Sequence, residues 1–316
     1  MADLRTSVPP QLAQATSTTS IMLDVIVALI PALGMSVYLF GPRVLALTLI
    51  SVGACVLSEY LYRRLTHQSN TLRDCSACVT GLLLAFNLPA GLPVWMSLVG
   101  AFIAIVIIKQ LFGGLGYNFA NPAIVGRIAM ALGFTGAMTS YTYPENGIDA
   151  LASATPLAVE ETAQNAGSYV TLLLGNHGGV LGETCAITLL IGGIYLIWTK
   201  VISPTIPVTY LATVAVFSLL CGYDPIYQLL SGGLILGAFF MATDYVTSPT
   251  TEKGKLVFGI GLGVITCLIR FFGTMNEGVS FAILLMNLVV PYIDVLTRQD
   301  RLGISKPKKN KGGAAK

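Results

Sequence analysis

Long apolar runs alternate along the chain with short segments of polar and helix-breaking residues. The runs at 21–40 and 44–62 approach the roughly 20 residues that a helix needs to cross a bilayer. No small-residue cleavage site follows the first run, and a polar stretch precedes it, so we expect the first run to be retained rather than removed as a signal peptide. Ten membrane-spanning helices are predicted, at residues 21–40, 44–62, 75–88, 94–109, 123–139, 180–199, 206–222, 229–242, 255–271 and 279–296.

The two halves of the chain share short stretches of similar sequence at a spacing of about 160 residues. The stretch at 81–86 resembles 233–239, 111–113 resembles 271–273, and 118–120 resembles 280–282. Five spans in each half would make the second half enter the membrane from the opposite side. The pattern therefore predicts an all-α polytopic membrane protein built from two inverted five-helix repeats.

The third and eighth predicted spans are short and end in polar or helix-breaking residues. Asn87-Leu88-Pro89 ends the third span, and the stretch from Thr243 to Pro249 ends the eighth. Helices that break at membrane depth leave backbone groups unpaired, which is tolerated only inside protein or beside a polar cavity. We therefore expect broken helices near the centre, beside a path for a ligand or an ion.

Composition and charge fix the class and predict the orientation. Hydrophobic residues make up 54% of the 316 residues and charged ones 10%, and mean hydropathy is +0.75, far more apolar than a soluble domain. The segment from Thr139 to Gly179 has acidic residues but no Lys or Arg. The other side carries most of the basic residues, so the positive-inside rule makes it the cytoplasmic side. These residues are Arg63, Arg64, Arg73, Lys109, Arg127, Lys200, Lys253, Lys255 and those of the C-terminal tail.

This orientation predicts a multi-pass protein of a prokaryotic cytoplasmic membrane with both termini in the cytoplasm. The basic tail is expected to contact anionic membrane lipid, and no nucleic-acid partner is expected. The predicted parts are a cytoplasmic N-terminal segment 1–20, a first repeat 21–139, an extracytoplasmic loop 140–179, a second repeat 180–297 and a basic cytoplasmic tail 298–316.

Ionisable residues inside membrane segments are candidates for function. Asp244, in the break after the eighth span, is the first candidate for ion coupling. Asp24, Glu59 and Asp294 lie nearer helix ends and are predicted to be interfacial. Arg127 is predicted to extend to the cytoplasmic surface, and a flavin or a charged partner is the alternative. Cys75 and Cys78 are interpreted as apolar-helix cysteines; no metal site within the chain is predicted, although a cluster shared with a partner protein stays open.

Three motifs carry a resemblance to a known family. They are Ser153-Ala154-Thr155 with Pro156-Leu157-Ala158 in the predicted loop, the stretch from Gly116 to Ala123, and the stretch from Met241 to Pro249. They resemble the family that comprises the D subunit of Rnf complexes and the B subunit of the sodium-translocating NADH:quinone reductase. The resemblance covers nearly the whole chain, and the short N-terminal segment favours the Rnf branch. Ala152 and Ala154 stand where the family motif often has Gly.

The resemblance implies that Thr155 carries FMN through a phosphoester, installed by an extracytoplasmic flavin transferase. It implies a relay subunit, not catalytic alone, in an ion-pumping complex that moves electrons between ferredoxin and NAD, together with the A, B, C and E subunits of the Rnf complex and especially the flavinylated G subunit. A noncovalent riboflavin is expected near polar breaks with fixed donors and acceptors, at Asn118, Asn121, Thr243 and Thr247. The alternative from architecture alone is a small-solute channel or transporter, which would carry no covalent flavin.

Overall fold

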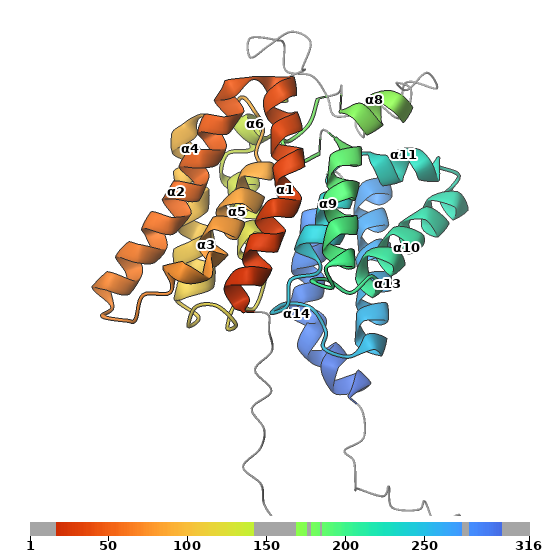
Figure 1. Ribbon diagram of the computed structural model, residues 1–316. Helices are drawn as coiled ribbons and strands as arrows, with labels where there is room; N and C mark the ends of the chain where they lie inside the picture. The colour runs from red at the N-terminus through yellow and green to blue at the C-terminus, as the bar shows by residue number, and fades with distance from the viewer. Residues whose placement is uncertain (1–16, 142–168, 176–177, 184, 274–277, 299–316) are drawn as a thin grey trace, which may run out of the picture.

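In the computed structural model, the described residues are 17–141, 169–175, 178–183, 185–273 and 278–298, and they form an all-helical bundle (Figure 1). The predicted flavin motif lies outside them. Helices of the first half run alternately up and down in Figure 1, beginning with α1 upward. They are α1 (Thr18–Phe40), α2 (Pro42–Leu65), η1 (Leu72–Asp74), α3 (Ser76–Phe86), α4 (Val94–Phe102), its π-helical continuation η2 (Ile103–Gln110), α5 (Pro122–Gly133) and α6 (Thr135–Met138).

The second half repeats this order of helices with the directions reversed, beginning with α9 downward (Figure 1). Both α1 and α14 therefore have their outer ends, Thr18 and Thr297, at the lower end of the bundle in this view. This is the arrangement expected of inverted repeats. The elements are α8 (Tyr169–Leu174), α9 (Ala186–Trp198), α10 (Thr205–Cys221), α11 (Pro225–Leu230), α12 (Leu234–Leu236), its π-helical continuation η4 (Gly237–Met241), α13 (Glu252–Phe272) and α14 (Val279–Thr297).

Several predicted spans have different limits in the structure. The predicted span 123–139 is interrupted at Phe134, and the span predicted from residue 180 becomes helical only at Ala186. The predicted span 229–242 is divided, since α11 ends at Leu230 and a turn with Gly232 at φ 62° precedes α12. Glycine adopts this left-handed backbone without steric cost, so the turn breaks an apolar run that the sequence pattern predicts as one helix.

Four of the described helices, α1, α2, α13 and α14, are long and apolar enough to cross a membrane. Five apolar stretches of 10–17 residues accompany them: Ser76–Phe86, Val94–Gln110, Pro122–Gly133, Ala186–Trp198 and Thr205–Cys221. The chain is thus a polytopic membrane protein. The lengths of these helices do not establish the predicted number of ten spans.

The break after α3 is closed by a segment from the other half, residues 180–183, which we call the linking segment. The amide of Gly182 donates to the carbonyl oxygen of Phe86 at 2.7 Å, and that of Leu181 donates to Leu88 at 3.1 Å. The hydroxyl of Ser36 donates to the Leu181 carbonyl oxygen at 2.8 Å. Carbonyl groups that the end of a helix leaves unpaired inside the membrane are therefore satisfied by protein.

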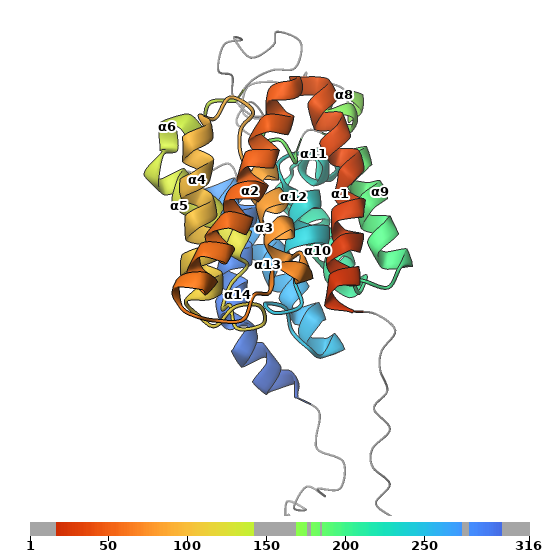
Figure 2. The same ribbon diagram turned by 60° about the vertical axis from the view of Figure 1, so that its left-hand side comes forward.

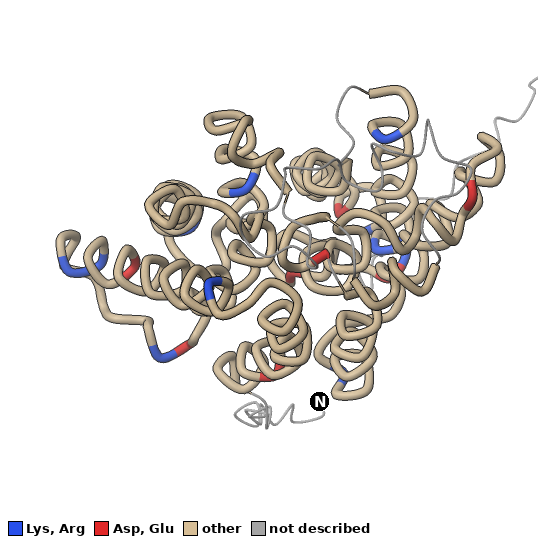
Figure 3. The backbone as a smooth tube through the Cα atoms, turned by 90° about the horizontal axis from the view of Figure 1, so that it is seen from above, with Lys and Arg blue, Asp and Glu red and all other residues tan. Residues whose placement is uncertain are grey.

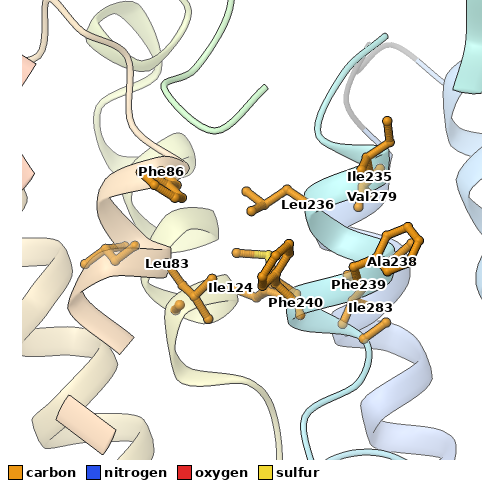
Figure 4. Packing of buried hydrophobic residues seen from close by; sticks show 14 of the residues in the cluster. Leu83, Phe86, Ile124, Ile235, Leu236, Ala238, Phe239, Phe240, Val279 and Ile283 are labelled. Carbon is orange, nitrogen blue, oxygen red and sulfur yellow. The ribbon is translucent and has the colours of Figure 1, made fainter. Parts of the chain in front are cut away.

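The core lies where the two broken helices face each other. Leu236 points from α12 toward Phe86 of α3, and Ile124 of α5 lies just below them (Figure 4). Phe86 and Ile124 are fully buried, and Leu236 is nearly so. The two halves therefore share one continuous apolar core rather than forming two separate bundles.

Helices α1 and α9 lie side by side in both views (Figures 1 and 2) and cross at a small residue. A Cβ atom on Gly192 would stand 2.2 Å from the carbonyl oxygen of Ala28, so only glycine permits this approach.

Replacing Gly192 by Ala is expected to lower the stability of the folded protein by about 1–3 kcal/mol, the range for overpacking a tight contact. The measurement is the unfolding temperature of the purified protein in detergent. The matched control is Gly53→Ala, on the exposed face of α2, where an added Cβ meets nothing within 4 Å. An unchanged unfolding temperature for Gly192→Ala would contradict the close crossing of α1 and α9.

Candidate functional site

A cavity of about 90 Å³ lies between the two halves. Its lining includes the first residues of α1 and α3, and these helices begin at the lower end of the bundle in Figure 1. Most of its wall is apolar and comes from α1, α3, η4 and the loop before α10. Its polar lining comes from both halves and is formed by Ser76, Thr80, Lys109, Asn118, Asn121, Thr243 and Asp244. An apolar cavity with a few convergent polar groups is the usual form of a ligand site.

The structure brings three of the predicted flavin-contact residues to this cavity. Asn118 and Asn121 lie in the loop before α5, and Thr243 follows η4. The side-chain amide of Asn121 donates to the Met241 carbonyl oxygen at 3.3 Å, and its oxygen accepts the Ala123 amide at 3.0 Å. Asn121 therefore begins α5 as its N-cap and ties the loop to the second half.

Asn118 and Thr243 are held by short local hydrogen bonds. The Asn118 amide donates to Ala120 at 3.1 Å, and the Thr243 hydroxyl donates to the Phe239 carbonyl oxygen at 2.6 Å. Both π-helical segments, η2 and η4, end beside this cavity, and such segments are often found at functional sites. The geometry fixes the positions of the polar groups before any ligand binds.

Asp244 lines the cavity, whereas Thr247 does not. The Thr247 hydroxyl instead donates to the Asp244 carboxylate at 3.1 Å. The side-chain amide of Asn287, on α14, is oriented so that its nitrogen and its oxygen both have partners. Its nitrogen donates to the Thr247 carbonyl oxygen and its oxygen accepts the backbone N–H of Asn121, each at 3.1 Å. Thr247 thus acts behind the cavity wall, by orienting Asp244.

A buried ion pair beside the cavity corrects the prediction for Glu59. Its side chain is completely buried and accepts a hydrogen bond from the Lys109 ammonium group at 2.7 Å, so it is not interfacial. Thr71 donates to the same carboxylate at 2.8 Å, and Arg63 lies 3.8 Å from it. Lys109, which we counted as a cytoplasmic loop charge, is only 2% exposed. No sequence spacing signals this pair, because 50 residues separate its members.

Arg127 is likewise buried and does not extend to the surface as predicted. Its guanidinium group donates to the Ser280 hydroxyl on α14 and lies 3.8 Å from the Glu183 carboxylate at the end of the linking segment. Seen from above, charged residues are few, and several lie among the helices in the middle of the bundle (Figure 3). Arg127 therefore joins three separate parts of the chain at the core.

The other two acidic residues predicted to be interfacial, Asp24 and Asp294, are half-buried. Asp24 accepts a hydrogen bond from the Tyr195 hydroxyl at 3.2 Å, and Asp294 accepts the Thr250 amide at 3.0 Å. Neither lines the central cavity.

The flavin motif of Ser153, Ala154 and Thr155 lies outside the described residues, but the helix that follows it is described. Tyr169 of α8 donates a hydrogen bond to Asp224, the N-cap of α11. This hydrogen bond raises the pKa of the Tyr169 phenol above its ordinary value. The segment that follows the motif is therefore anchored at the upper end of the bundle, which is the opposite end from the one near the cavity.

The fold and the cavity define a class: a polytopic helical membrane protein with inverted halves and a polar site between two broken helices. The family model described as NQR2, RnfD, RnfE family matches residues 5–303, so the chain belongs to this family. It is 46% identical, over 97% of its length and 98% of the relative's, to the D subunit of the sodium-translocating ferredoxin:NAD+ oxidoreductase complex of Acetobacterium woodii.

Two other relatives have similar names. The chain is 40% identical to the D subunit of the proton-translocating ferredoxin:NAD+ oxidoreductase complex of Clostridium ljungdahlii, over 91% of this chain and 92% of the relative. It is 36% identical to the D subunit of the ion-translocating oxidoreductase complex of Salmonella newport, over 89% of this chain and 93% of the relative. The family predicted from the three sequence motifs is thus confirmed.

Proposed function

We propose that this chain is the D-type membrane subunit of an Rnf-type complex, which transfers electrons between ferredoxin and NAD and exports sodium ions or protons. The observation that carries the proposal is the 46% identity, over nearly the full length of both chains, to a relative named as that subunit. The chain acts as a relay within the complex, and ferredoxin and NAD bind to other subunits.

The first electron carrier in the proposal is FMN attached to Thr155 through a phosphoester. Ser153, Ala154 and Thr155 stand in the family's flavinylation motif, in a segment with four acidic residues and no Lys or Arg. That segment is expected on the extracytoplasmic side, with both termini in the cytoplasm. A covalent attachment keeps the cofactor in place where water is close, while the protein supplies position and dielectric.

The second proposed site is the central cavity, for a noncovalent riboflavin. The lining suits a flavin ring in its chemistry, because Phe239 and Phe240 supply apolar surface while Asn118, Asn121 and Thr243 supply amide and hydroxyl groups; the cavity of about 90 Å³ has to widen to admit the ring. A bound flavin would add one-electron chemistry between the two halves of the protein. The residues of this chain orient the ring and exclude water.

Asp244 is the proposed residue for ion coupling, supported by its place in the cavity wall and by the hydrogen bond from Thr247. Burying a carboxylate within a membrane segment costs free energy, and such residues usually serve a function. The names of the relatives include both sodium and proton translocation, and either ion can be held by a carboxylate. The proposed protein partners are the A, B, C, E and G subunits of the complex and the flavin transferase.

Replacing Thr155 by Ala is expected to abolish covalent flavin, because the phosphoester needs the hydroxyl oxygen. The chain is expressed together with its flavin transferase and run on a denaturing gel, and flavin fluorescence of the band is compared with the wild type. Thr162→Ala, another threonine of the same segment, is the control and should stay fluorescent. A dark wild-type band beside a fluorescent known flavoprotein would reject the relay and favour solute transport.

A further inference from the structure

A chain of hydrogen bonds leads from the lower end of the bundle to the cavity. The Ser76 hydroxyl donates to the Asp74 carboxylate at 2.6 Å, and the Lys109 ammonium group donates to the Ser76 oxygen at 2.6 Å. Lys109 and Ser76 both line the cavity. Three groups that can each gain or lose a proton are thus connected through the short contacts that proton transfer requires.

The three groups are progressively more enclosed. Asp74 is half-buried, in the short helix η1 between α2 and α3. Ser76 is 4% exposed and Lys109 is 2% exposed. Solvent water therefore reaches Asp74 more readily than it reaches Lys109.

An ordinary helix cap accounts for only part of this arrangement. The Asp74 carboxylate also accepts the Ser76 amide at 2.9 Å, which is the usual role of an Asp at the start of a helix. A cap needs neither the Ser76 hydroxyl nor a lysine from another helix. Lys109 comes from η2, 33 residues away, and it reaches the hydroxyl from the cavity side.

We propose that Asp74, Ser76 and Lys109 form a proton relay between the lower end of the bundle and the central cavity. The relay rests on the proposed function, in that a redox-active ligand in the cavity requires a proton when it gains an electron from the electron carriers of the complex. Lys109 Nζ–H gives that proton and becomes a neutral amine. Solvent protonates the Asp74 carboxylate, and the Ser76 hydroxyl, turned from Asp74 toward the amine, gives its proton to the amine and takes the proton of the Asp74 carboxyl group. Asp74 is then a carboxylate again, and Ser76 turns back to donate to it.

The groups around Lys109 favour this cycle. Glu59, bonded to Lys109 at 2.7 Å, keeps the ammonium form stable between transfers, while Arg63 beside Glu59 limits the negative charge left when Lys109 is neutral. The thiols of Cys55 and Cys78 lie close enough to Lys109 to interact with it electrostatically. Asp244 lines the same cavity. While Lys109 is neutral, Arg63 therefore remains as a partial counter-ion of Glu59.

The test uses the purified complex, reduced by a light-activated reductant in weakly buffered solution with a pH-indicator dye. In the wild type, proton uptake should keep pace with reduction of the flavins followed by absorbance. In Ser76→Ala, uptake should slow by about 10²-fold, a usual loss on removing one proton-transfer group, while electrons still reach the covalent flavin. Ser76→Thr, which keeps the hydroxyl, should restore the rate.

Ser97→Ala is the matched control, because Ser97 is fully buried and donates only to Val94 of its own helix; its uptake rate should equal that of the wild type. A wild-type rate in Ser76→Ala, or reduction of the wild type without proton uptake, would overturn the relay. Acid extraction tests the proposed ligand separately. A wild-type complex without extractable flavin would refute riboflavin in the cavity, and the uptake rate of Ser76→Ala would still decide the relay.

Discussion

Replacing Lys109 by Met is expected to destabilise the folded protein by about 3–5 kcal/mol, because Glu59 would stay buried without its nearest counter-ion and would keep only Arg63, at 3.8 Å. The Glu59 side chain is completely buried, and its bond to Lys109 is 2.7 Å long. The measurement is the unfolding temperature of the purified protein in detergent.

The double variant Glu59→Gln with Lys109→Met supplies the control for this prediction. It removes both charges. The amide of Gln can still accept the hydrogen bond that the Thr71 hydroxyl donates to the Glu59 carboxylate, at 2.8 Å, in the wild type. We expect it to unfold at a higher temperature than Lys109→Met alone, since replacing a whole buried pair by neutral groups is often well tolerated. Equal losses in the single and double variants would show that Glu59 and Lys109 do not interact.

Replacing Arg127 by Leu is expected to have an effect of similar size, about 3–5 kcal/mol. The change removes the bond to Ser280 of α14 and leaves Glu183 buried beside an apolar side chain. Since Glu183 ends the linking segment that closes the break after α3, the contact between the two halves should weaken as well. Protease cleavage within the linking segment, compared with cleavage in the wild type, measures this second consequence.

Glu183→Gln provides the contrast for Arg127. The amide keeps the shape of the side chain and can still accept hydrogen bonds, and Arg127 keeps its bond to Ser280. A loss smaller than that of Arg127→Leu is expected, because Arg127 keeps its bond to Ser280, although the buried cation is left with a neutral partner. If Glu183→Gln proved as damaging as Arg127→Leu, the guanidinium group would matter chiefly through Glu183 rather than by joining three parts of the chain.

One cationic side chain in each half is arranged in a related way. In the first, Lys109 of η2 reaches Ser76 at the start of the short helix α3. In the second, Arg270 of α13 donates to the carbonyl oxygens of Gln228 and Ser231, just before the short helix α12. In each half, a cation from the following helix therefore contacts the beginning of a short helix or the residues just before it.

The sequence was sufficient for the class of protein and for the break after the third span. Apolar runs near 20 residues and the Asn87-Leu88-Pro89 stretch are local features, and α3 does end at Phe86. The polar residues Asn118, Asn121 and Thr243 could be selected because polar groups in an apolar run are rare and costly. Their meeting at one cavity follows from the inverted halves that the repeated stretches predicted.

The partners of the buried charges were decided only by the tertiary structure. Glu59 and Arg127 were predicted to lie at membrane interfaces because each stands near the end of an apolar run, where a charge can usually reach water. Whether it does so depends on which helices cover that end. Lys109 lies 50 residues from Glu59, and Ser280 lies 153 residues from Arg127. Contacts between residues so far apart in the sequence are set by helix packing and leave no periodic trace in the sequence.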